Sequence, residues 1–348
     1  MGVSLSIALA ICGNALMSAS LSSSIWTSPA IDEAANIVYY TTGSVKSFIG
    51  TDPMLFTESL LAFDGNTGQL LWYDQVRPAD PFDLDYGCHP MVFDAVHPAR
   101  EHETRPCVAA GNKAGMFCFN RYTGQKYWKV MLTNATQKGG PLVNSTAVAY
   151  NRVFVVSNSA GIRGRPPMSV AAGLHAYTGD IQWWVANPAL IEGPVAVAGE
   201  VFYQGLQNGI LEAIDAKTGE QLWKHNLPGP IRGGMSIANG TLYTSTGTSV
   251  DWNVRDLRAE KTWKLYAFSP DGQWFAYTVG DGPANTYEIW AQPFPPTGER
   301  RRISQEEGVM PLWTQDGQEL FYRPTSGVGG GRQTLSGISV STTPSLTF

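Results

Sequence analysis

Charged residues are scarce in this chain: Asp, Glu, Lys and Arg make up only 15% of its 348 residues. The net charge of -5 and the pI near 5.6 argue against a basic surface of the kind that binds nucleic acid or anionic membranes. Glycine and tryptophan, in contrast, are abundant, with 37 and 11 residues. Low charge together with many glycines and aromatics favours an all-β domain with many turns over a helical bundle.

Sequence motifs for several common chemistries are also missing. The four cysteines form no C-x-x-C or C-x-x-C-H pair, so no zinc knuckle or c-type haem is indicated. We expect these cysteines to be small buried strand residues. The five histidines show no H-E-x-x-H or paired spacing, so no metal-ligand set is predicted from them. There is no G-x-S-x-G, no P-loop and no G-x-G-x-x-G after a strand.

Long apolar runs are missing except near the N-terminus, where residues 3–19 are apolar and uncharged. This run is at the short end for a membrane-spanning helix, and it carries polar Ser, Asn and Gly residues. Residues 1–23 are therefore expected to be a signal peptide, a first strand of the fold or a membrane anchor. A signal peptide would place the protein in the periplasm or outside the cell. No later segment predicts a membrane span.

One six-residue motif, Thr-Gly-x-x-x-Trp, occurs four times, at residues 67–72, 123–128, 178–183 and 218–223. Each copy follows a strand of alternating apolar residues and leads into a second strand. This pattern indicates a β-hairpin whose glycine occupies a turn position that favours φ > 0. The third copy, "GLHAYTGDIQWW", lacks two residues before its turn in this alignment, so we expect a tighter hairpin there.

The spacing of the motif indicates a β-propeller. Its tryptophans are 56, 55 and 40 residues apart, and a four-stranded antiparallel blade needs about 40 residues. Further strands precede each hairpin, as in 36–43 and 152–158, which gives four strands per blade. A wide, flat side chain at one place in each blade is suited to fill the gap between adjacent blades. The tryptophans concerned are Trp72, Trp128, Trp183 and Trp223.

A second repeat follows, with "FSPDGQWFAY" at 268–277 and "WTQDGQELFY" at 313–322, 45 residues apart. Asp-Gly forms the hairpin turn and aromatic residues end the strand, so these segments predict two blades of another type. The expected fold is therefore an all-β propeller of about seven four-stranded antiparallel blades. The Gly-rich and Ser-rich segment 324–348 is expected to be a flexible tail or to add a closing strand.

The repeats resemble those of two known propeller families. Residues 24–268, with "SIWTSPAID", "VYYTTG" and "DLDYGCHPMVF", resemble the pyrroloquinoline quinone (PQQ) alcohol dehydrogenases, most of all the polyvinyl-alcohol-dehydrogenase type. Residues 265–323, with "FSPDGQWFAY" and "IWAQPFPPTG", resemble TolB-type propeller repeats. The join lies in 264–272, where either repeat accounts for "YAFS", and it divides the chain into PQQ-type blades up to 268 and TolB-type blades over 269–323.

The PQQ resemblance implies a site in the propeller channel. Trp26 matches the residue that stacks on the quinone, Asp85 matches the catalytic base, and Lys113 matches a quinone contact. Ser44 stands where the family has a calcium-ligating Asn, and Asn144 lies near a further cofactor contact. Each residue also has a purely structural interpretation: packing between blades for Trp26, turn positions for Asp85 and Asn144, and a surface lysine for Lys113.

The resemblance implies PQQ-dependent oxidation of a small alcohol, with PQQ and calcium as cofactors. The family's other calcium ligand, a Glu, and its vicinal Cys pair have no counterpart in this sequence. The alternative is a non-catalytic propeller that binds a protein, peptide or glycan at its channel face. A fragment or fusion without a settled function is a third interpretation.

Overall fold

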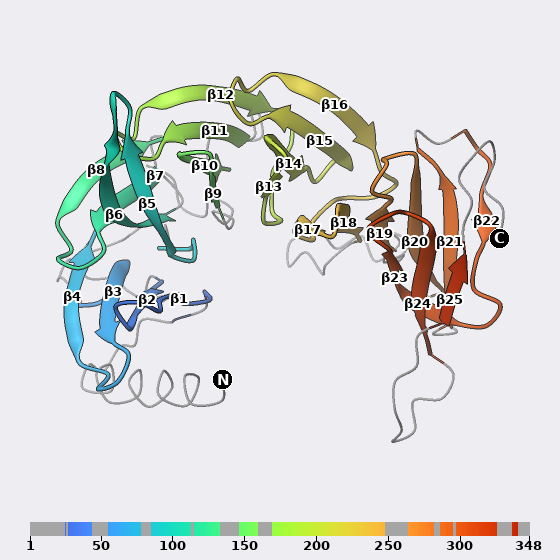
Figure 1. Ribbon diagram of the computed structural model, residues 1–348, viewed down its shortest axis with the longest axis horizontal. Helices are drawn as coiled ribbons and strands as arrows, with labels where there is room; N and C mark the ends of the chain where they lie inside the picture. Colours follow the sequence, from blue (N-terminus) through green and yellow to red (C-terminus); the bar gives the residue numbers. More distant parts are fainter. Residues whose placement is uncertain are drawn as a thin grey trace, which may run out of the picture. The chain divides into compact units, whose positions relative to one another are not determined.

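The computed structural model describes residues 25, 27–43, 55–77, 85–112, 115–132, 146–158, 169–247, 264–281, 286–294, 297–325 and 336–339. Within these ranges all regular elements are β-strands, and every strand pair is antiparallel (Figure 1). The expected all-β class is therefore confirmed. The chain divides into two units, residues 1–190 with 216–220 and residues 191–215 with 221–348, which are described separately below.

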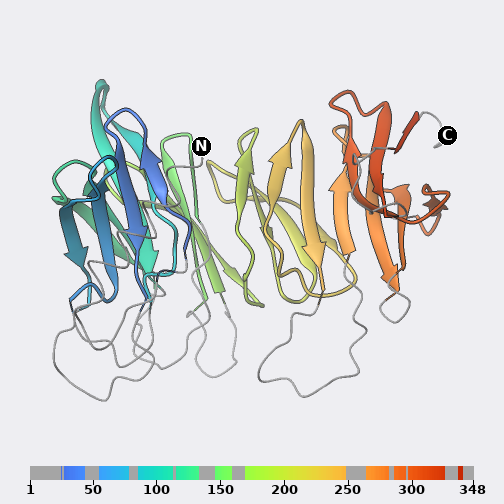
Figure 2. The same ribbon diagram turned by 90° about the horizontal axis from the view of Figure 1, so that it is seen from below.

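The first unit contains three four-stranded sheets, each an up-and-down meander of consecutive strands (Figure 2). The first sheet comprises β1 (Ala30–Asp32), β2 (Ile37–Thr41), β3 (Ser59–Asp64) and β4 (Leu70–Gln75). The second comprises β5 (Met91–His97), β6 (Arg100–Asn112), β7 (Gly115–Asn120) and β8 (Lys126–Met131). The third comprises β9 (Ala147–Ala149), β10 (Arg152–Ser157), β11 (Ser169–His175) and β12 (Ile181–Asn187).

The second unit contains sheets of four, six and three strands. The first comprises β13 (Ala196–Ala198), β14 (Val201–Gly205), β15 (Ile210–Asp215) and β16 (Gln221–Asn226). The six-stranded sheet comprises β17 (Ser236–Ala238), β18 (Thr241–Thr246), β19 (Lys264–Phe268), β20 (Trp274–Asp281), β21 (Thr286–Pro293) and β22 (Arg301–Arg302). The last comprises β23 (Gly308–Trp313), β24 (Glu319–Pro324) and β25 (Ser336–Ser339).

The β3–β4 hairpin is closed by side chains of the motif and of the residue three positions before it. In the β3–β4 hairpin, Asp64 Oδ1 accepts hydrogen bonds from the backbone N–H groups of Asn66 and Thr67, at 3.0 and 2.7 Å. Thr67 Oγ1 in turn accepts the N–H of Gln69 at 3.3 Å, and Gly68 has φ of 72°. Side-chain capping of this kind favours a turn over a continued strand, so the motif defines where each hairpin folds back.

The third hairpin is not tighter than the others, so that expectation is wrong. His175 N–H donates to the carbonyl of Asp180, and Gly179 N–H donates to the carbonyl of His175, both at 2.8 Å. The first hairpin has the same two bonds, between Asp64 and Gln69 and between Gly68 and Asp64. His175 occupies the place of Asp64, so no residue is missing from this turn and the sequence alignment had placed the gap wrongly.

Three of the four repeated tryptophans link successive hairpins, which confirms their expected place between blades. Their indole N–H groups donate to a backbone carbonyl in the hairpin of the next copy: Trp72 to Arg121 at 3.1 Å, Trp128 to Ala176 at 3.0 Å, and Trp183 to Ala216 at 3.0 Å. Trp128 and Trp183 are buried, whereas Trp72 and Trp223 are partly exposed. A buried indole N–H needs such an acceptor, so the bond fixes the ring in its slot.

The glycine of the motif has a second function besides its positive φ. It lies against the tryptophan ring of the preceding copy, and a Cβ atom there would approach that ring to between 2.7 and 2.8 Å. The pairs are Gly124 with Trp72, Gly179 with Trp128, and Gly219 with Trp183. Thr-Gly and Trp are therefore the two halves of one contact, repeated from copy to copy.

The fourth tryptophan is followed by the other repeat type and packs differently. Trp223 contacts Tyr203 and Phe294, with ring centroids 6.4 and 5.7 Å apart. Phe294 follows β21 and also contacts Phe268 at 5.2 Å. A phenylalanine of the second repeat type thus stands against the tryptophan where the earlier copies use a Thr-Gly hairpin.

Strand β19 belongs to both repeat patterns. It pairs with β18 through Tyr243–Ala267 and with β20 through Ala267–Ala276. The blades expected on either side of the join therefore share one strand and form the six-stranded sheet, so the described residues make six sheets. In the next sheet, Trp313 is buried and donates to the carbonyl of Ala267 at 3.0 Å, which ties β23 to the same strand.

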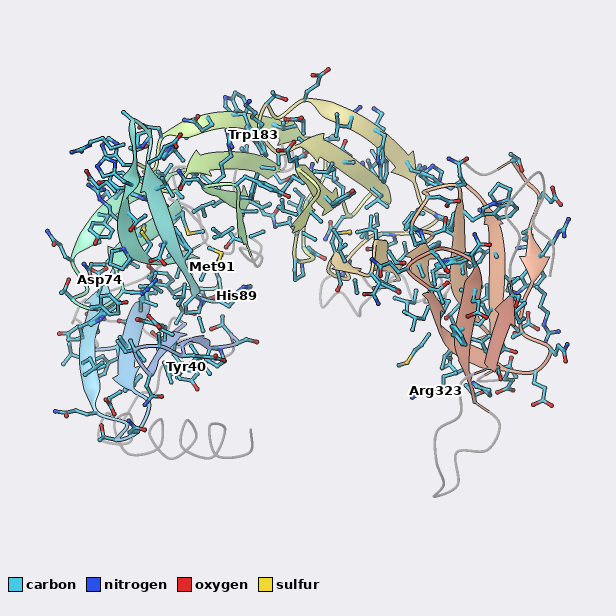
Figure 3. The ribbon with its side chains drawn as sticks, viewed as in Figure 1. Tyr40, Asp74, His89, Met91, Trp183 and Arg323 are labelled. Atoms are coloured by element: carbon cyan, nitrogen blue, oxygen red, sulfur yellow. The ribbon has the colours of Figure 1, made fainter. Side chains whose placement is uncertain are left out.

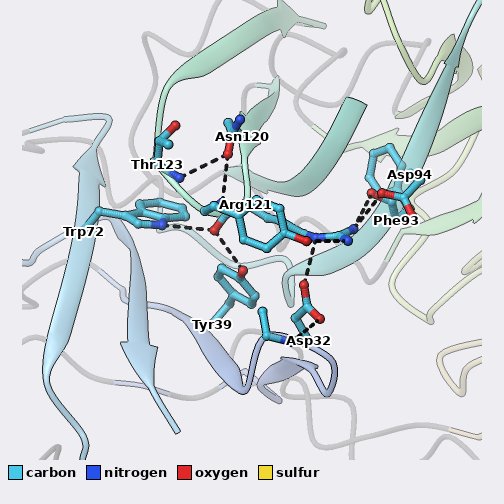
Figure 4. A network of polar contacts seen from close by, with 10 residues as sticks. Asp32, Tyr39, Trp72, Phe93, Asp94, Asn120, Arg121 and Thr123 are labelled. Atoms are coloured by element: carbon cyan, nitrogen blue, oxygen red, sulfur yellow. Dashed lines mark hydrogen bonds and ion pairs between the residues drawn. The ribbon is translucent and has the colours of Figure 1, made fainter. Parts of the chain in front are cut away.

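A charged network joins the first two sheets of the first unit (Figure 4). Arg121 Nε lies 2.8 Å from Asp32 Oδ2, and its NH1 lies 2.9 Å from Asp94 Oδ1. The Arg121 carbonyl also accepts the hydroxyl of Tyr39 at 2.8 Å, beside the Trp72 indole bond. The side chain of Asp32 is only 6% exposed, whereas that of Asp94 is 60% exposed.

Replacing Arg121 by methionine is expected to lower the free energy of unfolding by about 3–5 kcal/mol, because it leaves the buried Asp32 carboxylate without its counter-charge. Asp94→Asn is the matched control, and an exposed partner is worth about 1 kcal/mol or less. Urea unfolding of both variants checks the difference. Equal losses would contradict the assignment of Asp32 as the partner that matters.

Candidate functional site

The loop that leads into β5 carries Asp85, the predicted catalytic base. Asp85 is partly exposed and has φ of 39°, a left-handed conformation that Asp tolerates better than most residues. The next residue, Tyr86, is fully buried and its ring lies 5.8 Å from that of Phe117. Burial, with the nearby Asp74 charge, raises the pKa of Tyr86 well above its usual value, so the phenol stays neutral. The buried Tyr86 side chain thus fixes the position of the partly exposed Asp85 carboxylate.

Cys88 joins this loop to two other strand ends. Its backbone N–H donates to the carbonyl of Gly111, at the end of β6, at 3.1 Å. Its carbonyl accepts the hydroxyl of Thr41, the last residue of β2, at 3.0 Å. Thr41 Oγ1 also lies 2.7 Å from the hydroxyl of Thr27. Three segments that are distant in sequence therefore meet at one buried residue.

Of the five predicted site residues, the structure describes Asp85. The other four, Trp26, Ser44, Lys113 and Asn144, lie outside the described residues. In the sequence, Ser44 follows Thr41 by three positions and Lys113 follows Gly111 by two. The strand ends that lead to these two residues are therefore the ones joined by Cys88.

Sequence analysis missed two residues near this junction. His89 follows Cys88 directly and is labelled in Figure 3; burial lowers its pKa, so the imidazole is neutral at pH 7. Asn112 is buried, and its Oδ1 accepts the N–H of Gly115 at 3.0 Å across the β6–β7 turn. His89 had been considered only for zinc-type spacing, although its position inside "DLDYGCHP" was the available signal. Asn112 gave no sequence signal beyond its turn propensity.

A second polar group lies in the second unit, in the loops before β13 and β17. Arg232 Nε lies 3.2 Å from Glu192 Oε2, and Gln207 Nε2 donates to Glu192 Oε1. The backbone beside this pair is also joined, since Met235 N–H donates to the Pro194 carbonyl at 2.8 Å. Charge and hydrogen bonding are balanced within the group, which is consistent with a link between two sheets rather than a reactive centre.

The cysteines in the described ranges are buried, and none belongs to a cluster of possible metal ligands. Cys88, Cys107 and Cys118 are free and buried, and burial raises the pKa of the Cys88 and Cys118 thiols, so both stay protonated. In the same part of the chain, no group of three or more His, Cys, Asp or Glu side chains could hold a metal ion. The described residues contain no helix that is long and apolar enough to cross a membrane.

Two known families match different parts of the chain. Residues 14–147 match the family described as glucose/ethanol/alcohol dehydrogenase, beta-propeller domain. Residues 167–273 match the family described as outer membrane protein assembly factor BamB. The first match includes the Asp85 loop and the Cys88 junction. The second includes part of the sheet β9–β12 and the whole of the sheet β13–β16.

Individual relatives are distant. The polyvinylalcohol dehydrogenase of Sphingopyxis sp. is 24% identical over 306 residues, which cover 72% of this chain and 45% of that protein. The quinoprotein alcohol dehydrogenase PedH of Pseudomonas putida is 22% identical over 319 residues, which cover 83% of this chain and 50% of that protein. The chain therefore spans half or less of the length of these relatives.

A solved structure with the same fold is the quinohemoprotein alcohol dehydrogenase from Comamonas testosteroni. It aligns with a TM-score of 0.54 at 18% identity, over 66% of this chain and 45% of that one. At this identity the likeness shows the fold. Together with the family matches, it shows an all-β fold of the PQQ and BamB propeller type, whose sequence is distantly similar to the quinoprotein alcohol dehydrogenases over residues 14–147 and to the BamB family over residues 167–273.

Proposed function

We propose that the chain binds PQQ and oxidises an alcohol, with Asp85 accepting the proton of the hydroxyl group. The observation that carries this proposal is the Cys88 junction, which joins the Asp85 loop to the strand ends that lead to Ser44 and Lys113. The distant relation to quinoprotein alcohol dehydrogenases supports the same chemistry. Within this proposal the chain is of the polyvinyl-alcohol-dehydrogenase type, and residues 265–323 are of the TolB type.

The described residues fit a quinone-linked base better than a metal site. We expect Asp85, a partly exposed carboxylate on a loop anchored by the buried Tyr86 and Cys88, to contact a small alcohol. Calcium requires six to eight oxygen ligands, and the described part of the chain contains no cluster of acidic or imidazole ligands that could hold it. Trp26, Ser44, Lys113 and Asn144 are the residues proposed to contact PQQ.

PQQ, when bound, supplies the two-electron acceptor for the hydride that leaves the alcohol carbon. The protein's own part is proton transfer and orientation. Asp85 takes the hydroxyl proton, and its position is fixed because its neighbours Tyr86 and Cys88 are fully buried. His89, neutral because burial lowers its pKa, adds a polar group next to this loop without adding a positive charge.

Asp85→Asn is expected to leave PQQ binding intact and to lower the rate of alcohol oxidation about a hundredfold, the loss typical of removing a general base. Bound-quinone absorption in the presence of calcium measures binding, and reduction of an artificial electron acceptor measures turnover. Asp94→Asn is the matched control, because Asp94 is an exposed carboxylate of the neighbouring strand β5. An unchanged rate in Asp85→Asn would contradict its assignment as the base.

The second candidate is a non-catalytic propeller that binds a protein, peptide or glycan. It is favoured by the BamB-family match over residues 167–273. Wild-type protein that leaves the spectrum of free PQQ unchanged, with and without calcium, would contradict the first candidate and favour this one. We also propose a periplasmic or extracellular location, on the basis of the apolar segment 3–19.

A further inference from the structure

Four sheets end in the strand that follows the Thr-Gly turn: β4, β8, β12 and β16 each close the strand order of their sheet. In each of them the residue after the repeated tryptophan occupies the same position. Those residues are Tyr73, Lys129, Trp184 and Lys224. Two of these four residues are aromatic, and Trp184 is the more exposed of them, at 62% against 45% for Tyr73.

Strand β12 lacks the protection that its counterparts carry. Edge strands usually bear charges, often lysine, that prevent another strand from pairing with them. β8 has Lys126 and Lys129, β16 has Lys224, and β4 has Asp74. The seven residues of β12, Ile-Gln-Trp-Trp-Val-Ala-Asn, include no charged residue, no proline and no glycine. Besides Trp184, Ile181 is also exposed, at 48%. β12 is thus an uncharged edge with a large aromatic ring on its surface.

Another sheet of this chain shows that a blade can extend beyond its fourth strand. In the six-stranded sheet, β20 is the fourth strand after β17, β18 and β19. It accepts β21 as a further antiparallel partner through eight residue pairs, from Trp274–Pro293 to Asp281–Thr286. An additional strand on the outer edge is therefore compatible with the blade geometry of this protein.

A second copy of the chain is the occupant that suits β12. Two identical edge strands related by a twofold axis pair antiparallel, and a register centred on Trp184 sets this residue opposite its own counterpart. The two indole rings then become cross-strand neighbours, which is a favourable aromatic pair. The same pairing of β8 or β16 with its copy would bring lysines together, and like charges on paired strands are destabilising.

We propose that β12 is a homodimerisation edge, at which two copies join their third sheets into one continuous antiparallel sheet around paired Trp184 side chains. Trp183 on the same strand faces the opposite way and stays in its slot against Ala216 within one copy. Dimerisation therefore leaves the contacts between blades unchanged. The inference does not depend on PQQ binding or on the activity of Asp85.

The test uses the full chain and measures its mass by light scattering after size-exclusion chromatography, from low micromolar to near-millimolar protein. Wild type is expected to change from monomer to dimer across this range. Trp184→Lys, which introduces the residue found at this position in β8 and β16, is expected to raise the dimer dissociation constant by at least about tenfold. Leu222→Lys is the matched control: it adds the same charge at a residue 50% exposed on another edge, and it is expected to dimerise like wild type.

Hydrogen exchange of the β12 amides that do not bond to β11 gives an independent measurement. We expect these amides to exchange more slowly in concentrated than in dilute wild type, and equally fast at both concentrations in Trp184→Lys. Wild type that is monomeric at every concentration would overturn the proposal, as would equal dissociation of Leu222→Lys and Trp184→Lys. Strong protection, in the dilute monomer, of the β12 amides that do not bond to β11 would also overturn it, because another part of the chain would then cover the edge.

Discussion

Replacing Trp183 by alanine is expected to lower the free energy of unfolding by about 3–5 kcal/mol, the range for a buried tryptophan. Its side chain is 6% exposed, and its indole N–H donates to the Ala216 carbonyl at 3.0 Å. The ring lies between two glycines, because a Cβ atom at Gly173 or Gly219 would approach it to 2.5 or 2.8 Å. Alanine would leave a flat cavity between two backbones that cannot easily collapse, and an unsatisfied carbonyl beside it.

The control for this variant is the adjacent residue. Trp184 has the same side chain but is 62% exposed, so Trp184→Ala is expected to cost less than about 1 kcal/mol. Urea unfolding of dilute protein, followed by far-UV circular dichroism, measures both variants without a contribution from dimerisation. Similar losses for the two would contradict the assignment of Trp183 as the link between hairpins.

Gly179→Ala is expected to lower the free energy of unfolding by about 2–5 kcal/mol through two separate effects. The residue has φ of 80°, and the left-handed region costs a non-glycine residue about 1–2 kcal/mol. The added methyl group would also lie 2.8 Å from the Trp128 ring, and overpacking of this kind costs about 1–3 kcal/mol. Because Trp128 is hydrogen-bonded to Ala176, its ring cannot move away freely.

Gly199→Ala separates the two effects. Gly199 has φ of 56°, but no atom lies within 4 Å of the position that its Cβ would take. Only the backbone strain applies there, so a loss of about 1–2 kcal/mol is expected. Thermal and urea unfolding of both variants give the comparison. If Gly199→Ala is as destabilising as Gly179→Ala, the contact with the tryptophan contributes nothing and φ alone explains the motif.

Much of the fold was predictable because its signals are local and repeated. Alternating apolar residues and Thr-Gly turns recur at a spacing that suits four-stranded blades, so the sheets and the tryptophans between them could be expected. The second function of Gly179 could not be read in the same way. Within its own hairpin this residue indicates only a positive φ, whereas the ring that it supports belongs to Trp128, in a different copy of the motif.

The candidate site was less predictable for a similar reason. The resemblance to a family indicated Asp85, but the junction at Cys88 is made by its backbone N–H and carbonyl, and such bonds can form around almost any residue. No residue type at position 88 could have signalled that Thr41 and Gly111 meet there. In the third hairpin the residue type was misleading instead. Because His175 differs from the Asp64 of the first hairpin, the two positions were not aligned, although their backbone hydrogen bonds are the same.

Strand β19 has a consequence for how such a chain can arise. The five residues "KLYAF" pair with a strand of one repeat type on one edge and with a strand of the other repeat type on the other edge. Recombination of two genes within the codons for this strand would keep every backbone partner on both sides. A strand that pairs in this way is therefore a place at which two repeat patterns can be joined, and chimeric propellers can be designed by cutting at strands of this kind.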